Sequence, residues 1–175
     1  MRLKGKKIGI FVEREFEDLE FWVPVMRLTE EGAEVIKIGT GSEPTYRGKH
    51  GLSATPDVTA DQVSADDLDA VVVPGGWAPD KLRRYKAVLN IVRRANEQGK
   101  VIGSICHAGL VLISAGIIRE GHKATGSLGI KDDLVNAGAL WADEAAFRDG
   151  NLVWGRVVED IPYFCRELAE AIAGN

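Results

Sequence analysis

The stretch Gly103-Ser104-Ile105-Cys106-His107-Ala108-Gly109 carries the strongest indication of fold and chemistry in this chain. The apolar run at residues 101–102 predicts a β-strand, and the apolar pattern at residues 110–115 predicts a helix. A reactive side chain between a strand and a helix lies on a sharp turn at the end of a sheet, and small neighbours let the backbone crowd that turn. The stretch therefore predicts a nucleophile elbow with Cys106 in the nucleophile position.

Two features of this turn predict an activated thiol. The N–H groups and the positive dipole end of the following helix point at the sulfur, which favours the thiolate. His107 is the adjacent candidate base or electrostatic partner. An isolated Cys-His pair is more often part of a core, but the strand–turn–helix context favours the reactive interpretation. We therefore expect the pKa of the Cys106 thiol to lie below that of free cysteine.

The composition is that of an ordinary globular protein. The chain has 175 residues, 45% apolar and 27% charged, which predicts one domain over residues 1–175. The net charge is −4 with scattered positive charges, so we expect no nucleic-acid footprint. No apolar run has the length of a signal peptide or a membrane span, which predicts a cytoplasmic protein with no membrane partner. Cys165 falls in an apolar helical pattern and is interpreted as core, so no disulfide is expected.

Apolar runs alternate with helical patterns along the chain. Strands are predicted at residues 7–12, 35–38, 69–73 and 101–105, with short ones near 140, 147 and 152–154. Helices are predicted around residues 19–26, 88–95, 128–137 and 160–173, and a turn or short hairpin at 39–51. Continuous apolar strands indicate a parallel sheet covered on both faces. We predict an α/β three-layer sandwich with a mostly parallel, flavodoxin-like sheet.

Two further strand ends are expected near Cys106, because ligands bind beyond the carboxyl ends of such strands. The acidic segment Glu13-Arg14-Glu15-Phe16-Glu17-Asp18-Leu19-Glu20 follows the first strand. Acids suit a helix start, and one of them pointing at the sulfur would stay protonated; the residues alone do not select which. Pro74-Gly75-Gly76 is either a tight turn or one side of an oxyanion hole shared with the N–H of His107.

The spacing of the histidines and cysteines makes no metal pattern, and no glycine-rich phosphate loop follows the first strand. We therefore expect neither a metal nor a nucleotide cofactor.

Taken together, these segments resemble the ThiJ/PfpI-like family, within the class I glutamine amidotransferase-like fold. The matching segments run through nearly the whole chain in order: Glu15-Phe16-Glu17-Asp18, Gly48-Lys49-His50-Gly51, Val73-Pro74-Gly75-Gly76-Trp77-Ala78-Pro79-Asp80, Ser104-Ile105-Cys106-His107-Ala108-Gly109, Gly129-Ile130-Lys131-Asp132-Asp133-Leu134 and Asn136-Ala137-Gly138-Ala139.

The resemblance implies a role for each site residue. Cys106 would be the nucleophile, His107 its neighbour in the triad, and Glu17 the carboxylic acid that touches the nucleophile. Gly76 and His107 would supply the backbone oxyanion donors. The family's archaeal-type intracellular peptidases complete the triad with an acid from a neighbouring subunit, and that position falls on Asp80. The chain would then form a dimer or hexamer with a composite active site for a small carbonyl or peptide substrate.

The activity implied is that of a cysteine hydrolase, either an intracellular peptidase or a protein deglycase or glyoxalase. The alternatives are a stress-response redox sensor or chaperone-like protein with an oxidisable Cys106, and a hydratase or lyase on the same scaffold. Two segments depart from the family pattern, Thr125-Gly126-Ser127-Leu128 and Gly155-Arg156. Both lie near the site in the family, so we expect a smaller or more open pocket wall, and the substrate stays open.

Overall fold

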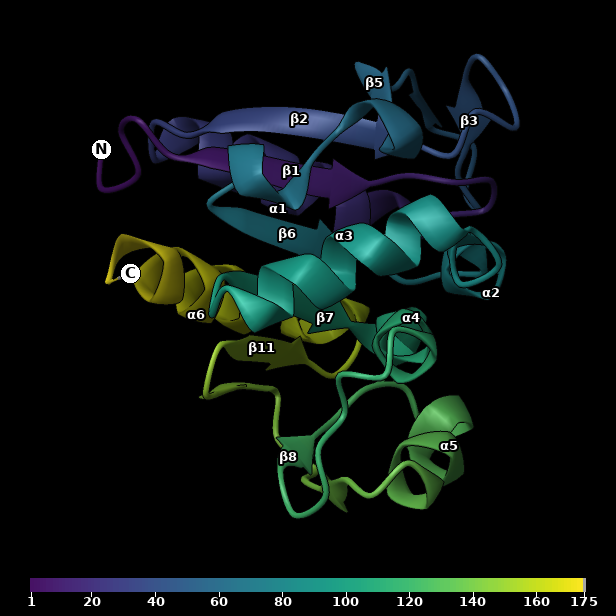
Figure 1. The fold of residues 1–175 in the computed structure, drawn as a ribbon, viewed down its shortest axis with the longest axis vertical. Coiled ribbons are helices and arrows are strands. Elements are labelled where there is room, and N and C mark those ends of the chain that lie inside the picture. The colour runs from purple at the N-terminus through teal and green to yellow at the C-terminus, as the bar shows by residue number, and fades with distance from the viewer. Residues whose placement is uncertain (175) are drawn as a thin grey trace.

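A twisted seven-stranded sheet runs through the centre of the protein, which is described over residues 1–174 by a computed structural model (Figure 1). The strands lie in the order β10-β11-β7-β6-β1-β2-β5. Their bounds are β1 (Lys7–Phe11), β2 (Glu34–Gly39), β5 (Val58–Thr59), β6 (Ala70–Val73), β7 (Val101–Ile105), β10 (Ala146–Asp149) and β11 (Leu152–Gly155). Every neighbouring pair is parallel except β10 and β11 at one edge.

The core of this sheet has the expected flavodoxin-like order, β2-β1-β6-β7-β11. Strands β6 and β7 are buried at every position, which is why their sequences are continuous apolar runs rather than alternating ones. The predicted α/β sandwich with a mostly parallel sheet is confirmed.

Helices cover both faces of the sheet (Figure 1). Helix α3 (Lys86–Glu97) covers one face, with α2 (Ala78–Leu82) and α4 (Gly109–Ser114) beyond its end. Helices α1 (Asp18–Glu30) and α6 (Ile161–Ala173) pack against each other on the opposite face. Each long helix buries an apolar stripe, as in α3, whose buried residues at helical spacing are Val88, Ile91, Val92 and Ala95.

Two small sheets and a short helix lie outside the main sheet. The expected hairpin near residue 50 is formed by β3 (Tyr46–Arg47) and β4 (Ser53–Ala54). Strands β8 (Lys123–Ala124) and β9 (Leu140–Trp141) pair in parallel near α5 (Lys131–Asn136). The α-helix expected from residue 128 begins only at Lys131. The preceding turn, Leu128–Ile130, is a 3-10 turn capped by the Ser127 hydroxyl, which accepts from the Gly129 N–H at 3.4 Å.

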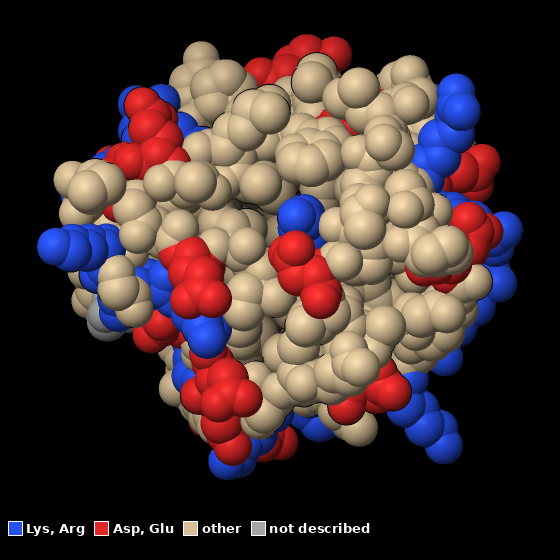
Figure 2. Space-filling model, turned by 90° about the horizontal axis from the view of Figure 1, so that it is seen from above, with Lys and Arg blue, Asp and Glu red and all other residues tan. Residues whose placement is uncertain are grey.

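Charged side chains of both signs are interspersed among uncharged ones on the face that Figure 2 shows. Within residues 1–174, no helix is both long enough and apolar enough to cross a lipid bilayer.

We predict that Leu168→Ala on α6 destabilises the fold by about 2–5 kcal/mol. The Leu168 side chain is fully buried against Gly103 of the central strand β7, so its loss leaves a cavity under the strand that carries Cys106. Urea unfolding measures the change. Arg166→Ala, an exposed substitution on the same helix, is the control and should change stability by less than about 0.5 kcal/mol. Equal unfolding midpoints for the two variants would contradict the prediction.

Candidate active site

Cys106 lies on a strained turn directly after β7. Its φ is 59°, in the left-handed region that a non-glycine residue adopts at a cost of about 1–3 kcal/mol. A 3-10 turn over Cys106–Ala108 leads from the strand into α4. The half-buried thiol therefore projects from the carboxyl end of the sheet, as the strand–turn–helix pattern predicts.

Two backbone N–H groups interact with the sulfur, those of Gly76 and His107. Gly76 has a φ of 75°, and a Cβ there would lie 2.4 Å from the Glu17 nitrogen and 2.5 Å from the Glu15 carbonyl oxygen. Only glycine fits this close approach of two backbone segments, which is also held by a bridge between Phe16 and Gly76. The structure thus brings both expected oxyanion donors to the sulfur.

The His107 ring is the nearest base. Its Nδ1 lies 3.3 Å from Sγ of Cys106, and its ring packs against Trp77 at 5.4 Å between centroids. Burial, followed by the positive charge of Lys49, lowers the pKa of His107. The ring is therefore neutral at neutral pH and able to accept a proton. No carboxylate among residues 1–174 is hydrogen-bonded to it.

Glu20 is the acid beside the thiol. Its side chain is fully buried, its Oε2 accepts from the Gly75 N–H at 2.8 Å, and its carboxyl interacts with the Cys106 sulfur. Burial, followed by the negative charge of Glu17, raises the pKa of Glu20 to about 7. Its Oε1 is buried and has no conventional hydrogen-bond partner in the described chain, which suits an oxygen that carries a proton.

Glu17 does not touch the thiol, and this corrects the contact expected of it. Glu17 is the N-cap of α1, where its Oε2 accepts from the N–H groups of Leu19 and Glu20, both at 2.9 Å. Its other oxygen lies 3.6 Å from Nε2 of His50. Two N–H donors fix the Glu17 side chain at the helix start, and its charge opposes ionisation of Glu20 one turn further on.

The thiol is less acidic than the turn alone predicts. Burial, then the charge and hydrogen bonding of Glu20, raise the pKa of Cys106 to about 12, against the opposing effect of the two N–H groups. The helix and His107 predict a thiol pKa below that of free cysteine. That prediction is wrong, because burial and the ionised Glu20 raise the thiol pKa instead. Because the two groups are adjacent and buried, ionisation of one opposes ionisation of the other.

Asp80 is not part of this cluster within one chain. It lies exposed on α2 and pairs with Arg84 one turn further along. Nothing in the same chain brings it to His107. Among the described residues, no group of three histidine, cysteine or acidic side chains has the geometry of a metal site.

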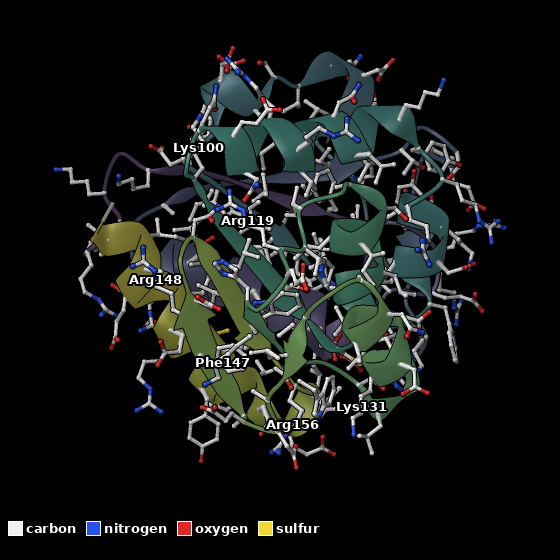
Figure 3. All side chains as sticks on the ribbon, turned by 60° about the horizontal axis from the view of Figure 1, so that its bottom comes forward. Lys100, Arg119, Lys131, Phe147, Arg148 and Arg156 are labelled. Carbon is white, nitrogen blue, oxygen red and sulfur yellow. The ribbon has the colours of Figure 1, made fainter. Side chains whose placement is uncertain are left out.

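The two departures from the family pattern follow from packing at this turn. A Cβ on Gly126 would lie 2.5 Å from the Cys106 carbonyl oxygen, which instead accepts from the Ser127 N–H at 3.1 Å. A Cβ on Gly155 would lie 2.9 Å from the Phe164 ring. The next residue, Arg156, lies at the periphery (Figure 3) and bonds to Asp160 and Asp143.

Comparisons with known proteins agree with this fold. The model of the DJ-1/PfpI family matches residues 6–171. The chain is 42% identical over 166 residues to "Deglycase PH1704" of Pyrococcus horikoshii, covering 95% of this chain and 99% of the relative. It is 35% identical over 163 residues to "Putative cysteine protease YraA" of Bacillus subtilis, covering 93% and 96%.

A solved structure from Anabaena variabilis is also similar, at a TM-score of 0.91 and 40% identity. It is described as a two-domain protein with DJ-1/ThiJ/PfpI-like and ferritin-like domains; the match covers 94% of this chain and 47% of that one. The chain belongs to the DJ-1/PfpI family, and the resemblance drawn from its motifs is confirmed.

Two contributors to the site, Lys49 and Trp77, were not among the expected site residues. Glu20 was one of the candidate acids that the residues alone left open, and the family resemblance selected Glu17 instead. Trp77 and Lys49 lie inside segments that match the family. Their contacts with each other and with His107 come from tertiary packing, which the sequence does not show. Glu20 follows Glu17 by one helical turn, and that spacing was the available signal.

We predict that Glu20→Gln lowers the pKa of the Cys106 thiol relative to the wild type. The ionised carboxyl raises that pKa, so a neutral amide of the same shape removes the opposing charge. The rate of iodoacetamide alkylation against pH measures the midpoint, with Cys165→Ala in both proteins so that one thiol reacts. Glu167→Gln on α6 is the matched control and should leave the midpoint in place. A midpoint that rises or stays in Glu20→Gln would contradict the prediction.

Proposed function

We propose that this protein is a cysteine-dependent hydrolase that attacks carbonyl carbon through Cys106, of the deglycase or peptidase kind. The observation that carries the proposal is the left-handed Cys106 with two backbone N–H groups at its sulfur and the His107 Nδ1 at 3.3 Å. The relatives named as a deglycase and a putative cysteine protease support the same reaction class.

The first step forms a bond between the sulfur and the carbonyl carbon. The thiolate forms when the thiol gives its proton to Glu20 or to His107. The electron pair of the carbonyl bond moves to oxygen, and the N–H groups of Gly76 and His107 are placed to stabilise that oxyanion. Their alignment before reaction makes them more effective than water, because no dipoles need to reorient.

The two substrate classes differ in the steps around this addition. With a peptide, the amine leaves with a proton from the site, and water hydrolyses the resulting acyl-enzyme. A glyoxal adduct first releases its amine, which takes a proton from the site as the C–N bond breaks and leaves a free aldehyde. The thiolate adds to this aldehyde, and the hemithioacetal loses the proton on that carbon and gains one on the neighbouring carbonyl carbon. The thioester that results is then hydrolysed, which restores the thiol. Glu20 and His107 are the two groups placed to move these protons.

The site also fits a role for a second subunit. Among residues 1–174, His107 has no carboxylate partner, while Asp80 is exposed on α2. Asp80 of the partner subunit would bind the His107 ring and stabilise its protonated form, as the third member of a triad does. The protein would then act as a dimer or hexamer. Its two cysteines are free, which suits a reducing cytoplasm.

We predict that Cys106→Ser lowers the turnover of methylglyoxal adducts or peptides by on the order of 10³-fold or more, because it removes the nucleophile. Product formation by mass spectrometry is the measurement, and circular dichroism checks that the variant folds. Cys165→Ala, which changes the other cysteine, should keep its activity. Full turnover by a folded Cys106→Ser protein would remove Cys106 from the mechanism.

We also predict that two inactive variants complement each other. Cys106→Ala and Asp80→Ala are each expected to be inactive, and after co-refolding part of the activity should return, because a mixed dimer holds one complete composite site. Each variant refolded alone is the control. A fully active Asp80→Ala protein, or a wild type that works as a monomer in light scattering, would disprove the shared site.

A further inference from the structure

A cavity of about 400 Å³ opens between the β1–α1 loop, the β3–β4 hairpin and α2. Its volume is in the range of small-molecule sites. Four basic and two acidic residues line it, with one glycine: Arg14, Arg47, Lys49, Lys81, Glu15, Glu43 and Gly48. The lining therefore carries an excess of positive charge, in a chain whose net charge is −4.

Two of the four cations are already paired. Arg14 lies 3.4 Å from Glu43, and Lys81 lies 3.0 Å from Glu15. Arg47 and Lys49 are exposed and have no carboxylate within ion-pair distance among residues 1–174. The cavity thus holds two positive charges without an anion to match them.

The walls of the cavity are fixed by a strained residue. Glu15 has a φ of 61°, which a non-glycine residue adopts only where its surroundings hold it. Its N–H donates to the Arg47 carbonyl at 2.8 Å, and its own carbonyl accepts from the Trp77 N–H at 2.9 Å. Glu15 therefore ties the first loop, the hairpin and the segment before α2 into one rigid rim.

Lys49, in the cavity lining, is connected to the reactive turn through Trp77. The Lys49 ammonium lies 5.5 Å from the centroid of Trp77, whose ring packs on His107. The same charge acts on both His107 and Glu20. A molecule whose carbonyl lies at Cys106 would extend along Trp77 toward Lys49 and Arg47.

We propose that this cavity binds an oxyanion, a carboxylate or a phosphate, carried by the carbonyl substrate, so that the protein prefers anionic substrates over neutral ones. This proposal rests on the proposed function, which places the substrate carbonyl at Cys106. Guanidinium and ammonium groups bind both anions through charge-assisted hydrogen bonds, and Arg47 supplies the planar fork that both anions match.

Two matched substrate pairs test the preference. 4-Carboxyphenylglyoxal against phenylglyoxal tests the carboxylate, and hydroxypyruvaldehyde phosphate against hydroxypyruvaldehyde tests the phosphate. Each is a 2-oxoaldehyde, which isomerises to a 2-hydroxy acid without an oxidant. We expect the wild type to show a higher kcat/KM for the anionic member of at least one pair. Arg47→Met should lower that anionic-to-neutral ratio roughly tenfold, the effect of one charged hydrogen bond. Arg166→Met, an exposed arginine on α6, is the control and should leave the ratio unchanged. Equal ratios in the wild type and Arg47→Met would overturn the proposal.

Binding without chemistry separates this proposal from the proposed function. Calorimetry with oxalate and with inorganic phosphate on Cys106→Ala should show binding of at least one anion, weakened roughly tenfold in Cys106→Ala/Arg47→Met. Such binding, together with a wild type that turns over none of the carbonyl substrates, would overturn the proposed function and support the anion site.

Three results would overturn the anion site. These are no binding of either anion, binding that Arg47→Met leaves unchanged, and loss of binding together with a change of oligomeric state in light scattering. The last would place the two cations in a subunit contact.

Discussion

The site depends on the left-handed backbone of Cys106 at the end of β7. That conformation costs free energy, and the packed sheet beneath it holds the turn in place. It directs the sulfur out of the sheet while aiming the next N–H at it. The neighbouring Gly126 lacks a Cβ, which leaves room for the crowded carbonyl of the cysteine. The fold thus uses the stability of its buried parallel strands to hold one residue in a reactive geometry.

The second constraint is that Glu20 and Cys106 are adjacent and buried, so that ionisation of one opposes ionisation of the other. Neither acid is exposed to enough water for both to ionise, so the local donors decide where the charge resides. The sulfur has the N–H groups of Gly76 and His107, whereas Glu20 has that of Gly75. Glu17 adds repulsion from one turn away. The carboxylate that never touches the thiol therefore contributes to its reactivity by keeping the proton on Glu20.

Pattern and motif were enough to predict the sheet, the elbow and the family, because buried strands and a strand–turn–helix nucleophile leave strong local signals. They did not select the correct acid. The choice between Glu17 and Glu20 depends on where α1 begins, and helix boundaries are the least certain part of such a prediction. The thiol pKa was predicted wrongly for a related reason. The helix and His107 are local in sequence, but burial and Glu20 come from tertiary packing.

Lys49 links the substrate side of the site to its acid–base chemistry. The charge that would attract an anion also lowers the pKa of His107, which keeps the ring neutral and able to take a proton. The same charge opposes the effect of Glu17 on Glu20. A bound anion would partly cancel the field of Lys49, raising the pKa of both His107 and Glu20. Both groups would then bind protons more readily. Binding of the substrate's anionic end would in this way make His107 and Glu20 better acceptors for the proton that leaves the thiol.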